Sequence, residues 1–94
     1  MKPAATDIRR KQLHFRATHR GFKEVDAILG AFAALHLSEL DAQELEMFAA
    51  LLEVPDHELY DWLRGAAPVP RLHDSPIFAR LKAICERKQP TWNA

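Results

Sequence analysis

The sequence predicts an all-α protein, a compact bundle of five short helices in a single domain. Along most of the chain, apolar residues recur three and four positions apart, which is the spacing of one helix face. No stretch shows the strict alternation of a half-buried strand, and only 3 glycines occur in 94 residues, which disfavours a turn-rich β-sandwich or barrel. With 48% apolar and 28% charged residues, the composition is that of a folded chain rather than a disordered one.

The first helix is predicted for residues 7–17. Thr6 or Asp7 can cap its N-terminus, because either side chain can accept a hydrogen bond from a free amide of the first turn. The apolar residues of this segment are Ile8, Leu13 and Phe15. So few apolar positions do not stabilise an isolated helix, and the segment therefore needs a partner helix.

The second helix is predicted to run from Phe22 to about Leu35, after an interruption at Gly21. Its apolar positions follow helical spacing and make it the central helix of the core. They are Phe22, Val25, Ile28, Leu29 and Phe32. Gly30 lies inside this helix, where glycine costs about 1 kcal/mol relative to alanine. This glycine therefore indicates a close crossing with a neighbouring helix.

A third helix is predicted to begin at Asp41 and to end before Pro55, which disfavours helical geometry at the residue preceding it. Asp41 and Glu44 have the spacing of a capping box, and Leu40 and Leu45 can form the apolar contact that accompanies it. The predicted buried stripe is Leu45, Phe48, Ala49 and Leu52.

A fourth helix is predicted to begin with Asp56 as its cap and to end at Gly65 in a left-handed conformation. Its predicted core side chains are Leu59, Trp62 and Leu63. Residues 66–74 form a linker that two prolines keep extended. Ser75 and Pro76 then supply a cap and a first-turn proline for a fifth helix.

The fifth helix is predicted to end near Lys88, because basic residues suit a helix C-terminus. Its apolar positions are Ile77, Phe78, Leu81, Ile84 and Cys85. The domain then spans residues 7–88, between flexible segments at residues 1–6 and 89–94. No role is assigned to Trp92 in the second of these segments.

Charge is strongly segregated along the chain, although the formal net charge is zero. Residues 1–23 contain seven Lys/Arg and one Asp, residues 24–63 contain ten acidic residues and no Lys or Arg, and residues 64–94 contain six Lys/Arg and two acidic residues. Such polarity indicates either complementary faces that attract each other within the fold or a basic face reserved for an acidic partner. Both explanations stay open, and the first is preferred.

No pattern in the sequence points to catalysis or to a metal. The 5 histidines include no pair four positions apart and no HExxH motif. Phosphate loops, nucleophile elbows and dinucleotide fingerprints do not occur, and Cys85 has the position of a small buried hydrophobe. We therefore predict that the chain is not an enzyme and has neither catalytic nor metal-binding residues. One cysteine, no long apolar run and no signal sequence favour a cytoplasmic protein.

The segment around Gly21 is the most unusual part of the sequence, because charge reverses there at a glycine between two predicted helices. Glycine permits a positive φ and leaves the main chain bare, so a partner surface can approach closely. Arg20 offers a planar fork to a carboxylate or carbonyl, and Glu24 follows one turn later. The alternative explanation is a loop glycine beside an ordinary surface ion pair.

At this junction the sequence resembles the FAD assembly factors of succinate dehydrogenase, the SdhE type, whose motif is R-G-x-x-E-x-D. Arg20, Gly21, Glu24 and Asp26 match that motif. The likeness covers residues 9–88. Its other stretches are Arg9-Arg10-Lys11, Leu13, Arg16, Leu29-Gly30-x-Phe32-Ala33 and Leu51-Leu52-x-x-Pro55-Asp56-x-x-Leu59-Tyr60-x-Trp62 with Gly65. Several stretches in this order make the match specific, and the missing presequence favours a bacterial source.

The resemblance implies an assembly chaperone that binds the apo flavoprotein subunit of succinate dehydrogenase, and in some bacteria that of fumarate reductase, and promotes covalent FAD attachment. In that reaction a histidine of the flavoprotein attacks the 8α-methyl carbon of the flavin. FAD is then the partner's cofactor, and the chaperone needs no cofactor of its own. We expect a monomer that binds no nucleic acid and does not insert into a membrane.

Eight residues are expected to form the contact with the flavoprotein. Arg20 and Glu24 would anchor it through polar contacts, Gly21 would allow close approach near its flavin site, and Asp26 would support the junction. Basic side chains would steer a negatively charged partner face. The residues expected around the motif are Arg9, Lys11, Arg16 and His19.

Two alternatives from other classes stay open. One is a small helical nucleic-acid-binding or regulatory domain, which the basic first 23 residues suggest and the acidic middle of the chain disfavours. An FAD carrier that delivers the cofactor to the flavoprotein is the other alternative. No dinucleotide fingerprint supports it, and FAD binding by the isolated chain would separate a carrier from a positioning chaperone.

Overall fold

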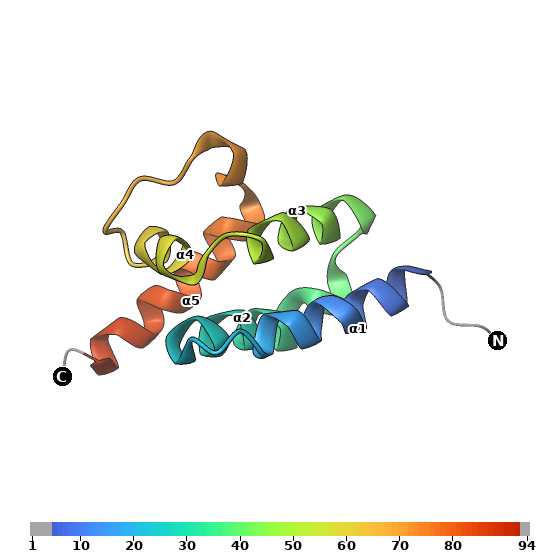
Figure 1. Cartoon of the computed structure of the whole chain (residues 1–94), viewed down its shortest axis with the longest axis horizontal. Coiled ribbons are helices and arrows are strands. Elements are labelled where there is room, and N and C mark those ends of the chain that lie inside the picture. Colours follow the sequence, from blue (N-terminus) through green and yellow to red (C-terminus); the bar gives the residue numbers. More distant parts are fainter. Residues whose placement is uncertain (1–4, 93–94) are drawn as a thin grey trace.

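Five α-helices and two single-turn 3₁₀ helices form residues 5–92, the part of the chain that the computed structural model describes (Figure 1). The α-helices are α1 (Ala5–Thr18), α2 (Lys23–His36), α3 (Ala42–Leu52), α4 (Asp56–Leu63) and α5 (Pro76–Trp92). The 3₁₀ helices are η1 (Leu37–Glu39) and η2 (Arg71–His73). No strand occurs within residues 5–92. The predicted all-α fold of five helices is confirmed.

The helices pack around α2, as the sequence predicts. Figure 1 shows α1 and α2 as an antiparallel hairpin, with α3 lying along α1 and α5 crossing α2. The short α4 packs against α2 and α5 near the turn that joins α1 to α2. Nearly all of the predicted apolar positions of α2, α3 and α5 are buried, among them Val25, Ile28, Leu29, Phe32, Leu45, Phe48, Ala49, Leu52, Ile77, Phe78, Leu81, Ile84 and Cys85.

The buried face of α1 differs from the predicted one. Ile8 is 49% exposed and Phe15 is 61% exposed, whereas Leu13 and Ala17 are fully buried. The reason is geometric, because Ile8 and Leu13 are five positions apart and point about 140° away from each other on a helix. The buried row is completed by Arg10, whose guanidinium donates to the carbonyls of two residues after α2, at 3.2 and 2.7 Å.

Several predicted helix ends are confirmed at the level of hydrogen bonds. The Glu44 amide donates to the Asp41 carboxylate at 2.8 Å, and the Asp41 amide donates to the Glu44 carboxylate at 3.0 Å, which completes the capping box. The Phe78 amide donates to the Ser75 hydroxyl at 3.3 Å. Gly65 has a φ of 77°, the left-handed conformation predicted at the end of α4.

The close crossing predicted at Gly30 is also present. A Cβ atom at this position would lie 3.3 Å from the Thr18 side chain at the end of α1. That distance is tighter than ordinary van der Waals contact, so Gly30 lets the C-terminal end of α1 approach α2. Alanine at this position would require the Thr18 side chain to move by a few tenths of an ångström.

Two predicted caps are wrong. The first helix begins at Ala5, so Thr6 and Asp7 lie inside it, and the Asp7 carboxylate pairs with Arg10 at 2.9 Å instead of capping the helix. Asp56 is the first residue of α4 and not its cap, since Pro55 occupies the cap position without a side-chain hydrogen bond. The Asp56 carboxylate instead forms an ion pair with Arg20.

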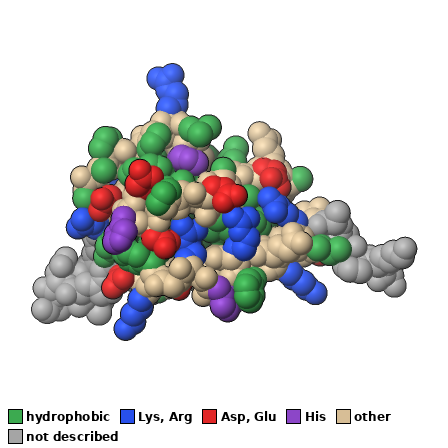
Figure 2. All heavy atoms as spheres, viewed as in Figure 1, with side chains coloured by type: hydrophobic (Ala, Val, Ile, Leu, Met, Phe, Trp, Pro, Cys, Tyr) green, Lys and Arg blue, Asp and Glu red, His purple; other side chains and the backbone are tan. Residues whose placement is uncertain are grey.

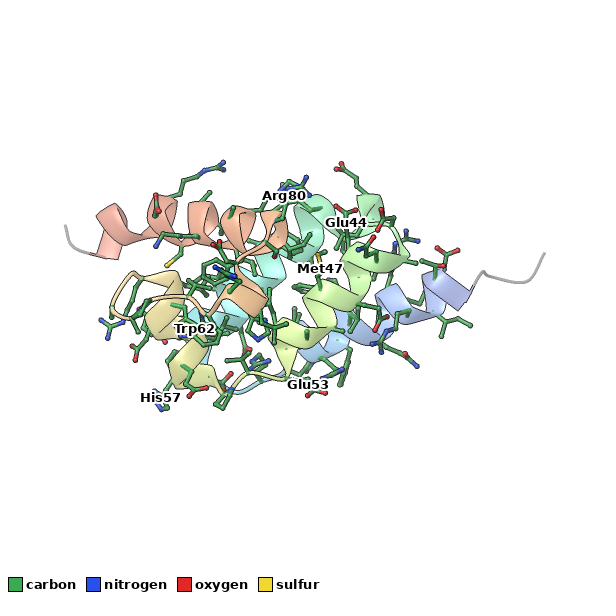
Figure 3. All side chains as sticks on the ribbon, turned by 90° about the horizontal axis from the view of Figure 1, so that it is seen from above. Glu44, Met47, Glu53, His57, Trp62 and Arg80 are labelled. Carbon is green, nitrogen blue, oxygen red and sulfur yellow. The ribbon has the colours of Figure 1, made fainter. Side chains whose placement is uncertain are left out.

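The structure also places the C-terminal helix and Trp62 differently. The backbone of α5 is helical to Trp92, beyond the end predicted near residue 88, and residues 1–4 and 93–94 lie outside the described range. Trp62 is only partly buried, unlike Leu59 and Leu63. Its ring lies beside the linker before α5, 5.5 Å from the ring of His73 (Figure 3). Trp62 therefore covers the edge of the core rather than its centre.

The single cysteine gives a stability prediction at alkaline pH. Burial, opposed in part by Lys82, raises the pKa of the Cys85 thiol above its usual 9.0. Because the unfolded thiol loses its proton at lower pH than the folded one, the free energy of unfolding should be constant at neutral pH and fall as pH rises past about 9. Urea unfolding at several pH values measures this. The fall should be smaller for Cys85→Ala, and identical pH profiles for both proteins would contradict the prediction.

A candidate partner-binding site at the turn between α1 and α2

The turn between α1 and α2 exposes its backbone at Gly21. This glycine has a φ of 89°, a conformation that residues with a side chain rarely adopt. A Cβ atom built at Gly21 would meet nothing within 4 Å, so the space in front of it is open. Gly21 is therefore required by the shape of the turn and not by crowding inside the protein.

Asp26 closes this turn from the first turn of α2. Its carboxylate accepts hydrogen bonds from the backbone amides of Arg20 at 3.1 Å and Gly21 at 3.2 Å. A carboxylate at this end of a helix is also favoured by the positive end of the helix dipole. The supporting contact expected of Asp26 within the junction is present.

Arg20 points into the protein and is not available as the predicted anchor for a partner. Its side chain is only 11% exposed. The guanidinium donates from Nε to the Asp56 carboxylate at 2.5 Å, from Nη1 to the Leu52 carbonyl at 2.7 Å and from Nη2 to the Val54 carbonyl at 2.5 Å. The last carbonyls of α3 lack partners within their helix, and the planar fork of arginine satisfies them together with a carboxylate.

Arg20 thus fastens the Gly21 turn to the junction of α3 and α4, which lies more than 30 positions away in the sequence. Asp56 belongs to this arrangement and is a site residue that the sequence analysis missed. The signals in the sequence were its place in a stretch shared with the family and its position after Pro55, which also suits a helix cap. The contact with Arg20 is tertiary, and no local pattern indicates it.

Glu24 has the environment that the site prediction requires, because it is partly buried and not engaged elsewhere. Among the side chains that the structure describes, those of residues 6–87, it has no hydrogen bond or ion pair. Its charge acts on Tyr60 of α4, since burial, followed by the negative charges of Glu24 and Cys85, raises the pKa of the Tyr60 hydroxyl.

The basic residues of α1 are engaged more than predicted. Arg9 pairs with Glu46 at 3.2 Å and Arg16 pairs with Glu53 at 3.2 Å, so α1 and the acidic α3 attract each other. Figure 2 shows basic and acidic side chains next to one another across the middle of this face. The preferred explanation of the charge segregation, complementary faces within the fold, is confirmed. Because these pairs are exposed, each contributes at most about 1 kcal/mol.

Other members of the predicted set remain on the surface. Lys11 is exposed and has no ion pair within the described part of the chain. His19 is exposed, stacks on Phe15 with ring centroids 3.9 Å apart, and forms a 2.7 Å hydrogen bond through Nδ1 with the Phe15 carbonyl. The pair of rings lies at the end of α1, directly before the Gly21 turn.

Aromatic side chains also flank the other side of the turn. The Phe22 ring lies 5.3 Å from the ring of His57, edge to face, and 5.3 Å from the ring of Tyr60. Figure 3 shows His57 at the outer edge of α4. The sequence analysis noted Tyr60 only as part of a family stretch and missed His57. Together, the open glycine, the partly buried Glu24 and these rings form a surface suited to binding a protein.

Comparison with known proteins gives the family to which the chain belongs. Residues 11–85 match the model of a family described as the flavinator of succinate dehydrogenase. The chain belongs to this family. The match includes all four residues of the R-G-x-x-E-x-D motif, so the resemblance noted in the sequence is confirmed.

Individual relatives agree with the family model. The chain is 41% identical over 73 residues to the FAD assembly factor SdhE of Acetobacter pasteurianus, and this match covers 78% of the chain and 67% of the relative. It is 31% identical over 88 residues to the mitochondrial succinate dehydrogenase assembly factor 2 of Yarrowia lipolytica and 30% identical over 77 residues to that of Dictyostelium discoideum. These matches cover 89% and 82% of the chain but only 61% and 55% of the relatives.

None of the helices within residues 5–92 is both long enough and apolar enough to cross a bilayer.

Proposed function

We propose that this protein is an assembly factor that binds the flavoprotein subunit of succinate dehydrogenase in its apo form and promotes covalent attachment of FAD. The observation that carries the proposal is the Gly21 turn, which is open to a partner and is held in place by Asp26 and Arg20. Membership of the flavinator family supports it. The relatives are named assembly factors, in agreement with the expectation that the chain is not an enzyme.

In this proposal, the chain positions the flavoprotein and takes no part in forming the bond to FAD. The flavoprotein supplies the histidine and binds the FAD, and the assembly factor holds the flavoprotein so that the histidine and the flavin meet. Fixing two reacting groups in attack geometry removes an entropic barrier to their reaction. A turn that three side chains hold rigidly suits this task, because a mobile contact would not fix the orientation of its partner.

The division of roles among the motif residues follows from the contacts. Gly21 allows the partner to approach the backbone, and Glu24 supplies the polar anchor. Asp26, Arg20 and Asp56 fix the shape of the turn from within the protein. Of the basic residues, Lys11 and His19 are proposed to meet the partner, whereas Arg9 and Arg16 are held by α3.

Four finer features belong to the same proposal. The chain acts as a monomer in a bacterial cytoplasm, and the bacterial relative and the single cysteine support that location. It holds no FAD of its own. Where a fumarate reductase is present, its flavoprotein is a second partner.

Complex formation tests this function. The purified protein is mixed with the apo flavoprotein subunit of a bacterial succinate dehydrogenase and passed over a sizing column with light-scattering detection, and the fumarate reductase flavoprotein serves as a second probe. A complex of one copy of each protein is expected. Equilibrium dialysis of the isolated protein against FAD should detect no stable binding. Tight FAD binding would instead favour a carrier, and the absence of any complex would contradict the proposal.

A further inference from the structure

A groove of about 240 Å³ runs between α1 and the end of α2. Ala33 and Leu37, which are almost fully buried, form its apolar floor. Its other lining residues are basic or polar, and they are Arg10, Lys11, His14 and Ser38. The groove is separate from the Gly21 turn, because Lys11 lies about 10 Å along the helix axis from Thr18, the last residue of α1.

The groove carries a positive charge that has no partner on the protein. Lys11 and His14 are exposed, and neither has a side-chain hydrogen bond or ion pair among the described side chains of residues 6–87. None of the described residues that line the groove is acidic. Arg10 differs from Lys11, since its guanidinium already pairs with Asp7 and donates to two carbonyls.

The side of α1 that faces α3 has the opposite character. Glu46 lines the hollow between α1 and α3, where it pairs with Arg9 at 3.2 Å. Arg16 pairs with Glu53 of the same chain, also at 3.2 Å. Complementary faces within the fold therefore account for the basic residues on this side of α1. They do not account for Lys11 on the side that faces α2.

These features favour a partner segment that combines an acidic side chain with an apolar one. A carboxylate complements the unpaired Lys11, and such complementarity fixes the register of two docked surfaces. An apolar side chain over Ala33 and Leu37 removes apolar surface from water, which is favourable. A nucleic-acid backbone would use the charge of Lys11 but would leave this apolar floor uncovered.

We infer that the groove between α1 and α2 receives an acidic segment of the flavoprotein subunit, in which a carboxylate pairs with Lys11 and a neighbouring apolar side chain covers Ala33 and Leu37. The inference rests on the proposed function, because it gives the same partner a second contact apart from the Gly21 turn. Two separate contacts fix the orientation of a docked protein, whereas a single contact leaves it free to rotate.

The first test reverses one charge in the groove and one outside it. Lys11→Glu changes the groove, and Arg80→Glu changes an exposed residue of α5 that has no ion pair among the described side chains (Figure 3). Calorimetric titration with the apo flavoprotein subunit gives the dissociation constants. Lys11→Glu should weaken binding by about 10-fold or more, and Arg80→Glu by less than about 2-fold. Both melting temperatures should stay within about 4 °C of the wild type, because both positions are exposed.

The second test fills the groove without changing the charge of the protein. Ser38 is exposed and lines the groove, so Ser38→Phe adds an aromatic ring there. Ala79→Phe adds the same ring at an exposed position of α5 outside the groove. Ser38→Phe should weaken binding of the flavoprotein by about 10-fold or more, and Ala79→Phe by less than about 2-fold.

Carbodiimide cross-linking identifies the group that Lys11 meets, because this reagent joins an amine to a carboxylate that it contacts directly. In the complex, mass spectrometry should find Lys11 joined to an Asp or Glu of the flavoprotein that has an apolar neighbour in its sequence. Lys11→Arg keeps the charge but removes the amine. This variant should keep the affinity within about 2-fold of the wild type and lose the cross-link.

Three results would overturn the inference while the proposed function stands. The first is binding by Lys11→Glu that is no weaker than binding by Arg80→Glu. The second is an equal effect of Ser38→Phe and Ala79→Phe. The third is a complex in which Lys11 is joined only to a carboxylate of its own chain or of a second copy. If the wild type does not bind the flavoprotein, the proposed function fails first.

Discussion

Replacing Gly21 with glutamine is expected to weaken binding of the apo flavoprotein subunit by about 100-fold or more. The new side chain would fill the open space in front of the turn, where no atom of the protein lies within 4 Å of the Cβ position. Because the Cβ position is open, the new side chain is expected to collide with a docked partner rather than with the protein itself. The positive φ of 89° adds a stability loss of about 1–2 kcal/mol. Binding is measured by calorimetry, and stability by urea unfolding.

Gly65 provides the matched control for this variant. It is exposed, and its φ of 77° imposes a similar backbone strain. Its Cβ position is 3.6 Å from the Lys82 amino group, so a side chain fits there as well. Gly65→Gln should therefore lose similar stability and keep its affinity. Equal losses of affinity in both variants would mean that strain, and not the surface at Gly21, causes the effect.

Replacing Arg20 with leucine is expected to have the largest effect on stability, a loss of about 3 kcal/mol or more in the free energy of unfolding. The guanidinium is almost fully buried and satisfies two carbonyls of the α3–α4 junction as well as Asp56. Leucine would leave all three acceptors without this donor. Because the loss separates the Gly21 turn from α4, flavoprotein binding should also fall. Urea unfolding followed by circular dichroism measures the stability.

Arg16 supplies the control for the arginine contact. Its pair with Glu53 is exposed, with 39% and 75% of the two side chains accessible, so Arg16→Leu should change stability by at most about 1 kcal/mol. If Arg20→Leu is as stable as Arg16→Leu, the internal contacts of Arg20 do not stabilise the fold. The original prediction, that Arg20 contacts the partner, would then be the better explanation.

Local signals in the sequence were sufficient for most of the helices. The spacing of Val25, Ile28, Leu29 and Phe32 predicts the buried face of α2, and the capping box at Asp41 predicts the start of α3. These features depend on residues within four positions of one another, which is the range over which helical periodicity acts. The thin apolar stripe of α1 misled the prediction of its buried face, because Arg10 occupies a position that an apolar residue usually holds.

The site was predictable in its location but not in its internal contacts. The glycine, the charge reversal and the family motif indicate the turn, and Asp26 supports it over a short sequence distance. The direction of Arg20 depends on Leu52, Val54 and Asp56, which are brought near only by the folded bundle. The pairing of α1 with α3 is tertiary in the same way. Sequence patterns therefore gave the residues of the site, and packing decided which of them face a partner.

In the function proposed here, the Gly21 turn positions a flavoprotein for covalent FAD attachment. The most direct test incubates apo flavoprotein subunit and FAD alone, with the wild-type protein, or with Gly21→Gln, and follows flavin fluorescence of the flavoprotein band after denaturing electrophoresis. The wild type should raise the initial rate of attachment by about 10-fold or more, and Gly21→Gln should not raise it. Equal rates in all three incubations, with the wild-type complex formed, would contradict the claim.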